Sequence, residues 1–348
     1  MGLFILRRLG VMILTALCLT FVVFFLTNLY PNLEKLAKAE GTQRMQDSEV
    51  LQWLDNRGYT DSLLSRYGQW LGVVPGYVKE GTDGKIRGRC IKPNQTPEEA
   101  SSFCGILQGD WGLSTVFKDK VSSIIGTRLA LTGKLMLWVM LLMVPSALIL
   151  GVLAGMREGS RTDRTLSTFA ITTTATPEYV SGVILIAVFA SSAVGLKWFK
   201  GTATSAMDTA TFANFFLPVL TIALYGMGYI ARMTRASMAE VMTAQYIRTA
   251  RLKGVSFSNI VIKHALRNAL IAPFTVIMLQ FPWLLNGVVI VETLFNYKGF
   301  GWTLVQAAGN NDIELLLGVS VVSVVVVLVT QLISDIGYVY LNPRISVN

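Results

Sequence analysis

The sequence predicts an all-α polytopic membrane protein with six transmembrane helices. Of its 348 residues, 52% are hydrophobic, and the mean hydropathy is +0.53, which points to a membrane rather than to a soluble domain. Six segments approach the ~20 apolar residues that one membrane crossing requires. Basic residues lie at alternate ends of successive segments, which is the charge pattern of a multi-pass protein.

The six segments differ in their charge. Five carry no charged residue, whereas the third, Leu166–Ala193, carries Glu178. Arg7 and Arg8 precede a full-length apolar run without a small-residue cleavage site, so the first segment is expected to remain as an anchor. The five uncharged segments are Leu9–Tyr30, Leu135–Met156, Phe212–Ala231, Ile271–Val291 and Leu315–Ile333.

Charge also predicts the orientation of the chain. Cytoplasmic loops of membrane proteins carry an excess of Lys and Arg, so the basic ends should face the cytoplasm and place both termini there. These basic ends comprise Arg7, Arg8, Arg157, Arg161, Arg164, the loop between the fourth and fifth segments, and Arg344.

We expect three parts: an anchor helix at 1–30, an extracytoplasmic insertion at 31–125 and a membrane core of five helices at 126–348. The insertion carries 12 Lys and Arg and 12 Asp and Glu, so the formal net charge of +9 resides entirely outside it. One helix is predicted in the insertion, near Asp47–Trp70. A nucleic-acid partner is excluded, because no basic cluster with stacking aromatics lies on a soluble part of the chain.

Two of the three cysteines, Cys90 and Cys104, lie in the insertion, where an exported segment permits oxidation. We hypothesise a disulfide between them. Recovery of both thiols in the free form by non-reducing peptide mapping would contradict this hypothesis. Cys18 lies in the first span and is expected to pack there. The chain has a single histidine, so no His/Cys set has the spacing of a metal site.

Pro177, Glu178 and Tyr179 stand near the middle of the third span, after a run of threonines. Pro177 should kink the helix, and the threonine hydroxyls can satisfy the carbonyl groups that the kink frees. An acidic side chain within a membrane should face a cavity or a partner. Two interpretations stay open for these residues: they line a substrate pathway, or Glu178 is a buried, hydrogen-bonded or protonated acid.

The segment Tyr246–Pro273 holds several basic residues and no acid. Gly254 suits the end of one short helix, and Ser256 or Ser258 suits the start of a second. The sequence therefore predicts a hairpin of two helices at about 236–270, lying under the membrane domain. Its second helix should turn Val261, Ile262, Ala265, Leu266 and Ala269 to one face and Lys263, His264 and Arg267 to another. An amphipathic helix on anionic lipid is the alternative.

Arg248-Thr249-Ala250, three residues and then Gly254 resemble the E-A-A-x3-G signature of permease subunits of ATP-binding-cassette importers. Together with Arg251, the wider string resembles the dipeptide/oligopeptide (peptide, nickel and opine) branch of that family. The resemblance implies that the hairpin is the coupling helix that docks on an ATPase. The coupling residues would be Arg248, Thr249, Ala250, Arg251 and Gly254.

Further strings extend the resemblance over most of the chain except about 32–105. The usual Pro-Gly-Asp-Pro after the first span is missing, and the following loop is longer than usual. The loop after the first span should meet a solute-binding protein. Both departures from the family pattern therefore leave the identity of the substrate open. The strings are Gly109–Ser114, Pro177 with Tyr179, Val291–Phe295, Gly299–Gly301 and Asp335–Arg344.

The family implies a transport subunit rather than an enzyme, in the inner membrane of a bacterium. It implies a second homologous permease in a heterodimer, two ATPase subunits and an extracytoplasmic solute-binding protein. This chain would bind no cofactor, and the partner ATPases would use ATP and Mg²⁺. Gly133-Lys134 fails the phosphate-loop pattern, because no Gly lies five residues earlier and Leu135 follows. Peptides are the expected substrates, with oligosaccharides as the alternative.

Two other classes of function are weaker. A polytopic membrane enzyme would need paired acids, a metal set or a Ser/His constellation facing one cavity. Glu178 is alone in its span, Glu292 lies near the outer boundary, and His264 belongs to the basic hairpin. A sensor that used the insertion would lack a cytoplasmic output domain.

Overall fold

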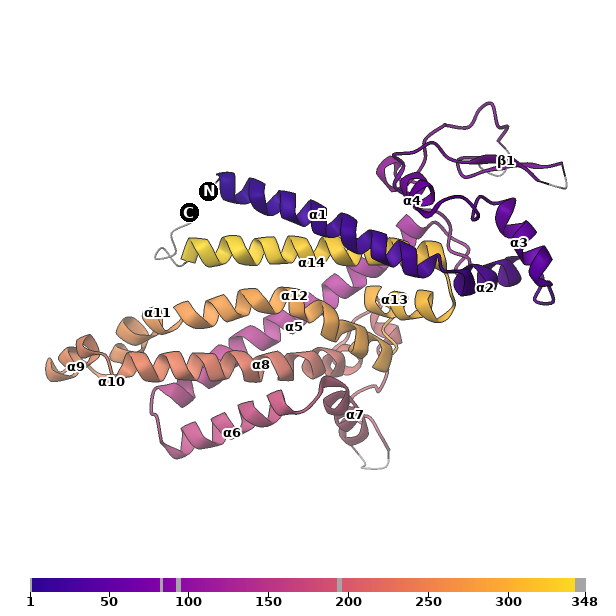
Figure 1. Ribbon diagram of the computed structural model, residues 1–348. Coiled ribbons are helices and arrows are strands. Elements are labelled where there is room, and N and C mark those ends of the chain that lie inside the picture. Colours follow the sequence, from indigo (N-terminus) through magenta and orange to yellow (C-terminus); the bar gives the residue numbers. More distant parts are fainter. Residues whose placement is uncertain (1, 82–83, 92–94, 193–195, 342–348) are drawn as a thin grey trace. The chain divides into compact units, whose positions relative to one another are not determined.

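The computed structural model describes residues 2–81, 84–91, 95–192 and 196–341, with the backbone alone at 2–5, 281–287 and 338–341. The chain divides into two compact units (Figure 1). We call residues 1–6, 129–302 and 326–348 the core unit, and residues 7–128 and 303–325 the insertion unit. Asn342, Pro343 and Arg344, which complete the C-terminal family string, lie outside the described residues.

The core unit is built around α8 (Phe212–Met242). Helices α6 (Arg161–Ala175), α7 (Glu178–Phe189) and α12 (Ile271–Leu294) all pack against α8. Its apolar interior includes Leu135, Met143, Ile222 and Phe295, all almost fully buried. The remaining elements are η2 (Thr204–Ala206), α9 (Gln245–Leu252), α10 (Phe257–Asn259), the π-helix η3 (Ile260–Ala265), α11 (Leu266–Ala269), and most of α5 (Val121–Gly155) and α14 (Ile313–Leu341).

Helix α5 meets α8 at two glycines. A Cβ atom on Gly151 would lie 2.6 Å from the Ala231 carbonyl oxygen, and one on Gly155 would lie 2.7 Å from the Met238 Cβ. Small residues permit such close approach of two backbones in a membrane. The sequence repeats the same four-residue spacing at Gly159, but Gly159 lies in the turn after α5, with φ of +76°. The close contact with α8 therefore involves two glycines.

The insertion unit gathers the start of the chain, the long loop after it and the segment before the last span. A cluster of buried apolar side chains, among them Phe24, Leu33, Val50, Trp70 and Leu317, forms its core. Its elements are α1 (Gly2–Thr27, from Arg7), α2 (Tyr30–Glu40), α3 (Asp47–Asp55), α4 (Leu63–Leu71), the antiparallel strands β1 (Val78–Glu80) and β2 (Ile86–Gly88), η1 (Ile106–Gln108), the start of α5, α13 (Phe300–Gly309, from Thr303) and the start of α14.

The structure is mostly helical and has four helices that are long and apolar enough to cross a membrane. The count rises to six if each of two bent helix pairs forms one span. One pair is α6 with α7, bent by 107°, and the other is Phe257–Ala269 with Ile271–Gln280, bent by 51°. The chain is therefore a polytopic membrane protein. The predicted kink at Pro177 is a full break, because Thr176 and Pro177 both adopt extended backbone.

Several expected boundaries were wrong. The single helix near Asp47–Trp70 is two helices, α3 and α4, and the turn between them holds Gly58 at φ of +70°. The expectation of a hairpin from about 236 was also too early, since α8 continues to Met242. Polar residues do not end a helix when tertiary contacts support them, so α5 and α8 are longer than their apolar runs.

Candidate functional site

The basic segment forms a tight hairpin beyond the end of α8. Helix α9 ends at Leu252, and Gly254 follows it with a φ of +73°, the left-handed conformation that favours glycine. The Gly254 N–H donates to the Arg251 carbonyl at 3.0 Å, and the Val255 N–H donates to the Ala250 carbonyl at 3.2 Å. These two bonds are the Schellman pattern of a helix C-terminus. Helix α10 then starts after Ser256.

The hairpin is fastened to the core unit by an apolar underside. Ile247, Ala250, Ile260 and Ala265 are buried in one cluster with α8 residues such as Met238. The Ser237 hydroxyl also donates to the Ala269 carbonyl at 2.8 Å and so ties α11 to α8. A force on the hairpin should therefore move α8 with it.

Its two arms are also tied to each other. The Asn268 side-chain amide donates to the Tyr246 hydroxyl at 2.9 Å, which joins α11 to α9. At the turn, the Arg157 guanidinium lies 5.1 Å from the centre of the Phe257 ring, within the range of a cation–π interaction.

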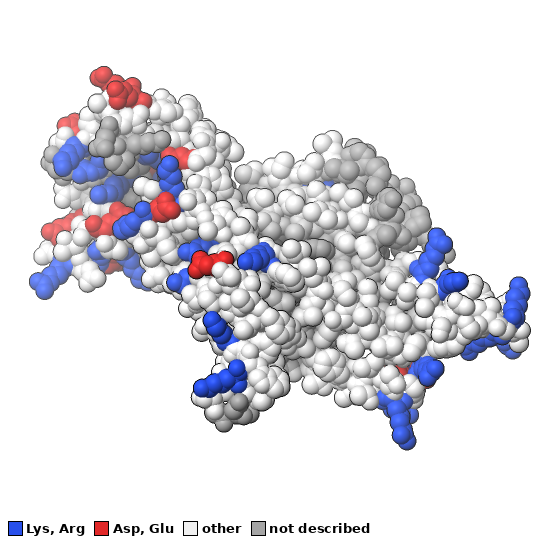
Figure 2. All heavy atoms as spheres, turned by 180° about the vertical axis from the view of Figure 1, so that it is seen from behind, with Lys and Arg blue, Asp and Glu red and all other residues white. Residues whose placement is uncertain are grey.

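The outer surface of the hairpin is exposed and basic. Four of the five predicted coupling residues, Arg248, Thr249, Arg251 and Gly254, are exposed, and Ala250 is buried in the underside. Figure 2 shows Lys and Arg gathered, with little acid among them, at the end of the core unit that carries the hairpin. The exposed basic set also includes Lys253, Lys263, His264 and Arg267.

The predicted apolar face of the hairpin was wrong at one residue, whereas the predicted cap position of its second helix was right. Ile262 is 64% exposed and does not join the apolar face. Residues Ile260–Ala265 form a π-helix, whose wider turn carries an extra residue and rotates the side chains from their α-helical positions. Ser256 occupies the cap position of α10, but its side chain makes no capping hydrogen bond.

A buried ion pair near the hairpin escaped the sequence analysis. Arg235 of α8 donates to both Asp163 carboxylate oxygens, Nε at 3.0 Å and Nη2 at 2.8 Å. The Gly159 N–H and the Ser167 hydroxyl donate to the same carboxylate. Asp163 also lies three residues after the Ser160 cap of α6, and this Ser-x-x-Asp spacing was the available signal.

The predicted pathway residues lie at the break between α6 and α7. Pro177 caps α7, Glu178 is buried, and Tyr179 is 55% exposed. The Glu178 Oε1 atom has no hydrogen-bond partner among the described residues. Further along α7, Gly182 lies so close to Leu294 of α12 and Thr221 of α8 that a Cβ atom would clash. The structure thus turns Glu178 inward and Tyr179 outward.

Glu292 organises the loop before α13. Its carboxylate is fully buried and accepts hydrogen bonds from the Thr132 hydroxyl and, at 2.9 Å, from the Trp302 N–H. A side chain at Gly299 would collide with this carboxylate, and one at Gly301 would collide with Val289 and crowd the carboxylate. Bulky residues at either glycine would displace the loop, which explains why this string holds two glycines.

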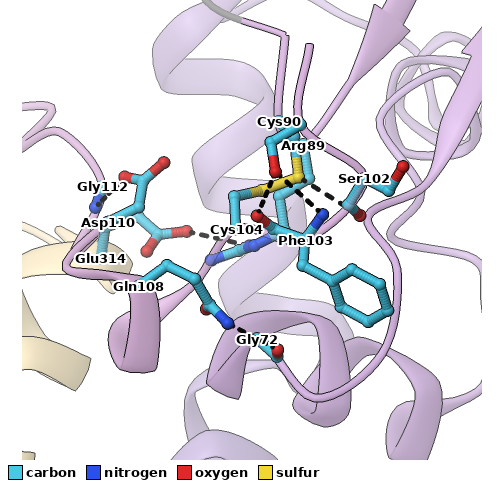
Figure 3. The surroundings of a disulfide bond; sticks show 11 residues. Gly72, Arg89, Cys90, Ser102, Phe103, Cys104, Gln108, Asp110, Gly112 and Glu314 are labelled. Atoms are coloured by element: carbon cyan, nitrogen blue, oxygen red, sulfur yellow. Dashed lines mark hydrogen bonds and ion pairs between the residues drawn. A yellow bond between two sulfur atoms is a disulfide. The ribbon is translucent and has the colours of Figure 1, made fainter.

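In the insertion unit, Cys90 and Cys104 form a disulfide, with Cα atoms 5.5 Å apart (Figure 3). This is the pair hypothesised from the sequence. It joins the chain after β2 to the chain before η1, and the Gly76 N–H supports the link by donating to the Ser102 carbonyl at 2.9 Å. On the other side, Gln108 donates to the Gly72 carbonyl at 3.0 Å.

Residues 147–347 match the family model described as "Binding-protein-dependent transport system inner membrane component". The chain is 34% identical over 243 residues to a probable peptide ABC transporter permease protein, y4tP, of Sinorhizobium fredii, covering 69% of this chain and 77% of that protein. It is 34% identical over 247 residues to the oligopeptide transport system permease protein AppB of Bacillus subtilis, with the same coverage.

The glutathione transport system permease protein GsiC of Escherichia coli K12 is 33% identical over 239 residues, with 69% of this chain and 76% of that protein covered. The residues matched by the family model include the hairpin. The chain belongs to the family of binding-protein-dependent transport system inner membrane components, as a permease subunit of an ABC importer of the bacterial inner membrane.

Proposed function

We propose that this permease forms half of a translocation pathway for short peptides, with six membrane-spanning helices and both termini in the cytoplasm. A second, homologous permease completes a heterodimer, and an extracytoplasmic solute-binding protein delivers the substrate to the side of the insertion at 31–125. Two separate ATPase subunits bind ATP and Mg²⁺ and supply the energy. The names of the similar permeases support a peptide or glutathione-like cargo.

The observation that carries the coupling role is the contrast between the two faces of the hairpin. Its underside is buried against α8, and its outer face presents exposed basic residues around Gly254. Such a surface suits a partner of complementary charge, and its rigid mounting suits the transmission of movement. ATP-driven closure of the ATPases would then draw two hairpins together and rock the helices that carry them.

The pathway role of Pro177, Glu178 and Tyr179 is part of the same proposal. A buried carboxylate without a full set of partners, next to a broken helix, suits a surface that a second subunit and a polar solute complete. We expect Glu178→Gln to lower uptake several-fold with unchanged amounts of folded permease. Asp208→Asn, on an exposed loop, is the control. Unchanged uptake and unchanged stimulation of ATP hydrolysis in Glu178→Gln would contradict the pathway role.

The whole proposal is tested by isolating this chain from its native membrane and identifying the proteins that accompany it. A second permease, ATPase subunits and an exported binding protein are the expected companions. The ligand held by that binding protein identifies the cargo, and an oligosaccharide there would replace the peptide assignment. Recovery of the chain alone, stable without an ATPase, would contradict the coupling role of the hairpin.

A further inference from the structure

A cavity of about 720 Å³ lies entirely within the insertion unit. Its walls come from the end of α1, the turn between α3 and α4, the chain after β2, the loop at 108–113 and the start of α14. Sites for small molecules commonly have volumes of about 300–1,000 Å³. The cavity is therefore large enough for a small organic solute.

The walls of the cavity combine polar and apolar groups and carry an excess of positive charge. Two carboxylates, Asp110 and Glu314, face it together with a larger set of cations. The segment 31–125 is neutral as a whole, so this excess is a local property of the cavity. The cations are Arg57, Arg66, Arg89 and Lys120.

One facing pair of opposite charges in the cavity is incompletely bonded (Figure 3). The Arg89 Nη1 atom lies 3.9 Å from the Glu314 Oε1 atom, which is too far for a hydrogen bond. Arg89 Nε and Glu314 Oε2 are both buried and have no hydrogen-bond partner among the described residues. Buried polar atoms nearly always have a hydrogen-bond partner in folded proteins, so a bound molecule would supply the partner that each of these two atoms requires.

The other arginines divide into one that is occupied and one that is available. Arg66 donates to the Tyr59 carbonyl and to the Asn28 side-chain oxygen. The Arg57 guanidinium lies 3.8 Å from the centre of the Trp53 ring, and the described residues give it no hydrogen-bond acceptor. With respect to the described residues, the Arg57 guanidinium therefore has donors available for a ligand.

The aromatic walls lie close to the same charges. Burial raises the pKa of the Tyr77 phenol, Arg89 and Arg57 lower it, and Glu314 raises it, so Tyr77 stands among these charged groups and stays neutral. Trp111 also lines the cavity. An apolar or aromatic body can therefore rest beside the unpaired charges.

We propose that this cavity binds a small zwitterionic solute with an ammonium and a carboxylate on one carbon atom, as in a free α-amino acid. The carboxylate accepts hydrogen bonds from Arg89 and Arg57, and the ammonium donates to Glu314. A single α-carbon places the two charges at a separation similar to that between Arg89 and Glu314, and a side chain then lies against Tyr77 and Trp111. The site goes beyond the proposed function, since the coupling and pathway residues belong to the core unit.

The first test measures binding of L-phenylalanine to the purified full-length permease in lipid nanodiscs by calorimetry. Phenethylamine lacks the carboxylate, and 3-phenylpropionate lacks the ammonium. Each should bind about 10- to 100-fold more weakly, as expected for the loss of charged hydrogen bonds. Equal binding of all three compounds, or no binding of L-phenylalanine, would overturn the proposal. Tighter binding of the dipeptide Ala-Phe would contradict the proposal that the ammonium and the carboxylate of the ligand share one carbon atom, and would indicate a peptide as the ligand.

The second test uses Arg89→Gln and Glu314→Gln, with Lys118→Gln as the control because Lys118 is exposed in the same unit and outside the cavity. Both cavity variants should weaken the binding of L-phenylalanine about 10-fold or more, and the control should not. Unchanged binding in both cavity variants would overturn the proposal. If neither variant folds, the binding of the three phenyl compounds to the unmutated permease still tests the proposal. Neither test involves transport, so a negative result leaves the importer role untouched.

Discussion

The hairpin at 245–269 and the cross-linked part of the insertion unit are constructed in opposite ways. The hairpin turn is closed by backbone bonds between near neighbours, and its exposed surface carries one sign of charge. The insertion unit is held by links that reach further along the chain: the disulfide, and aromatic contacts that join Tyr67 and Trp70 to Phe21 and Phe24. Figure 2 shows acidic and basic residues interspersed on the insertion unit.

This difference indicates what each region can tolerate. A locally closed hairpin keeps its shape when its surface changes, so surface substitutions there should affect partners rather than folding. A unit with long-range links loses order when one link is removed, so substitutions there should affect stability first. The following predictions test that division, from the largest effect to the smallest.

Gly254→Arg should abolish coupled uptake and leave the permease in the membrane. No atom lies within 4 Å of the position of an added Cβ, so the new side chain would project from the exposed turn. The left-handed backbone adds a strain of about 1–2 kcal/mol for an L-residue. Uptake and ATP hydrolysis are measured together in proteoliposomes with the ATPases and the binding protein.

Gly254→Ala is the matched control for this variant, because it introduces the strain without the bulk. It should retain most of the uptake. Normal transport by Gly254→Arg would contradict the coupling role, and equal loss in both variants would assign the defect to backbone strain rather than to docking.

Removing the disulfide should produce the largest loss of stability. The two cysteines are 14 residues apart in the sequence, and closing a loop of that size stabilises a fold by about 3 kcal/mol in the chain-entropy model. Cys90→Ser with Cys104→Ser should speed hydrogen exchange in residues 76–104 and leave that of the hairpin unchanged. Cys18→Ser is the control, since Cys18 is a free thiol. Unaltered exchange in the double variant would show that packing alone holds the insertion.

Asp163→Asn should destabilise the core unit by about 2 kcal/mol, below the 3–5 kcal/mol typical of a broken buried pair, because Arg235 is 31% exposed. Glu158→Gln is the matched control. Its carboxylate also faces Arg235, at 3.3 Å, but is 56% exposed, so its loss should change stability by less than about 0.5 kcal/mol. Thermal unfolding of both variants in the same detergent measures the difference in stability. Equal destabilisation by the two variants would contradict a larger contribution of Asp163 than of Glu158.

Tyr246→Phe should have the smallest effect, about 0.5–1 kcal/mol on hairpin opening, since it removes one exposed hydrogen bond. Hydrogen exchange of the α9 and α11 amides measures this opening. Asn268→Ala should give the same change, and the double variant should add nothing further. Additive effects would show that the two side chains act separately.

The sequence predicted features that depend on local chemistry. The apolar segments coincide with helices, and Gly254 ends α9 because only a residue tolerant of positive φ fits the turn. The pairing of Cys90 with Cys104 followed from their placement in one exported segment. Arg248 and Arg251, which the family resemblance assigned to a docking surface, are both exposed.

Features that depend on tertiary contacts could not be predicted in this way. The bond between Asp163 and Arg235 spans 72 residues, and no local pattern connects them. The cavity of the insertion unit needs residues from both ends of the chain, such as Arg57 and Glu314. Ile262 fits an α-helical apolar face by periodicity, and only the π-helix in the structure places it outside.

That π-helix has a consequence for the register of the basic face. A π-turn accommodates one residue more than an α-turn between the same anchor points, so Ile260–Ala265 behaves as an α-helix with a single insertion. Deleting one residue there would restore α-helical spacing, and the segments before and after it would keep their orientation, because the anchor points stay the same. Only the side chains inside the wide turn, such as Ile262 and Lys263, would move to new positions. The surplus residue thus determines which side chains of this one turn face outward.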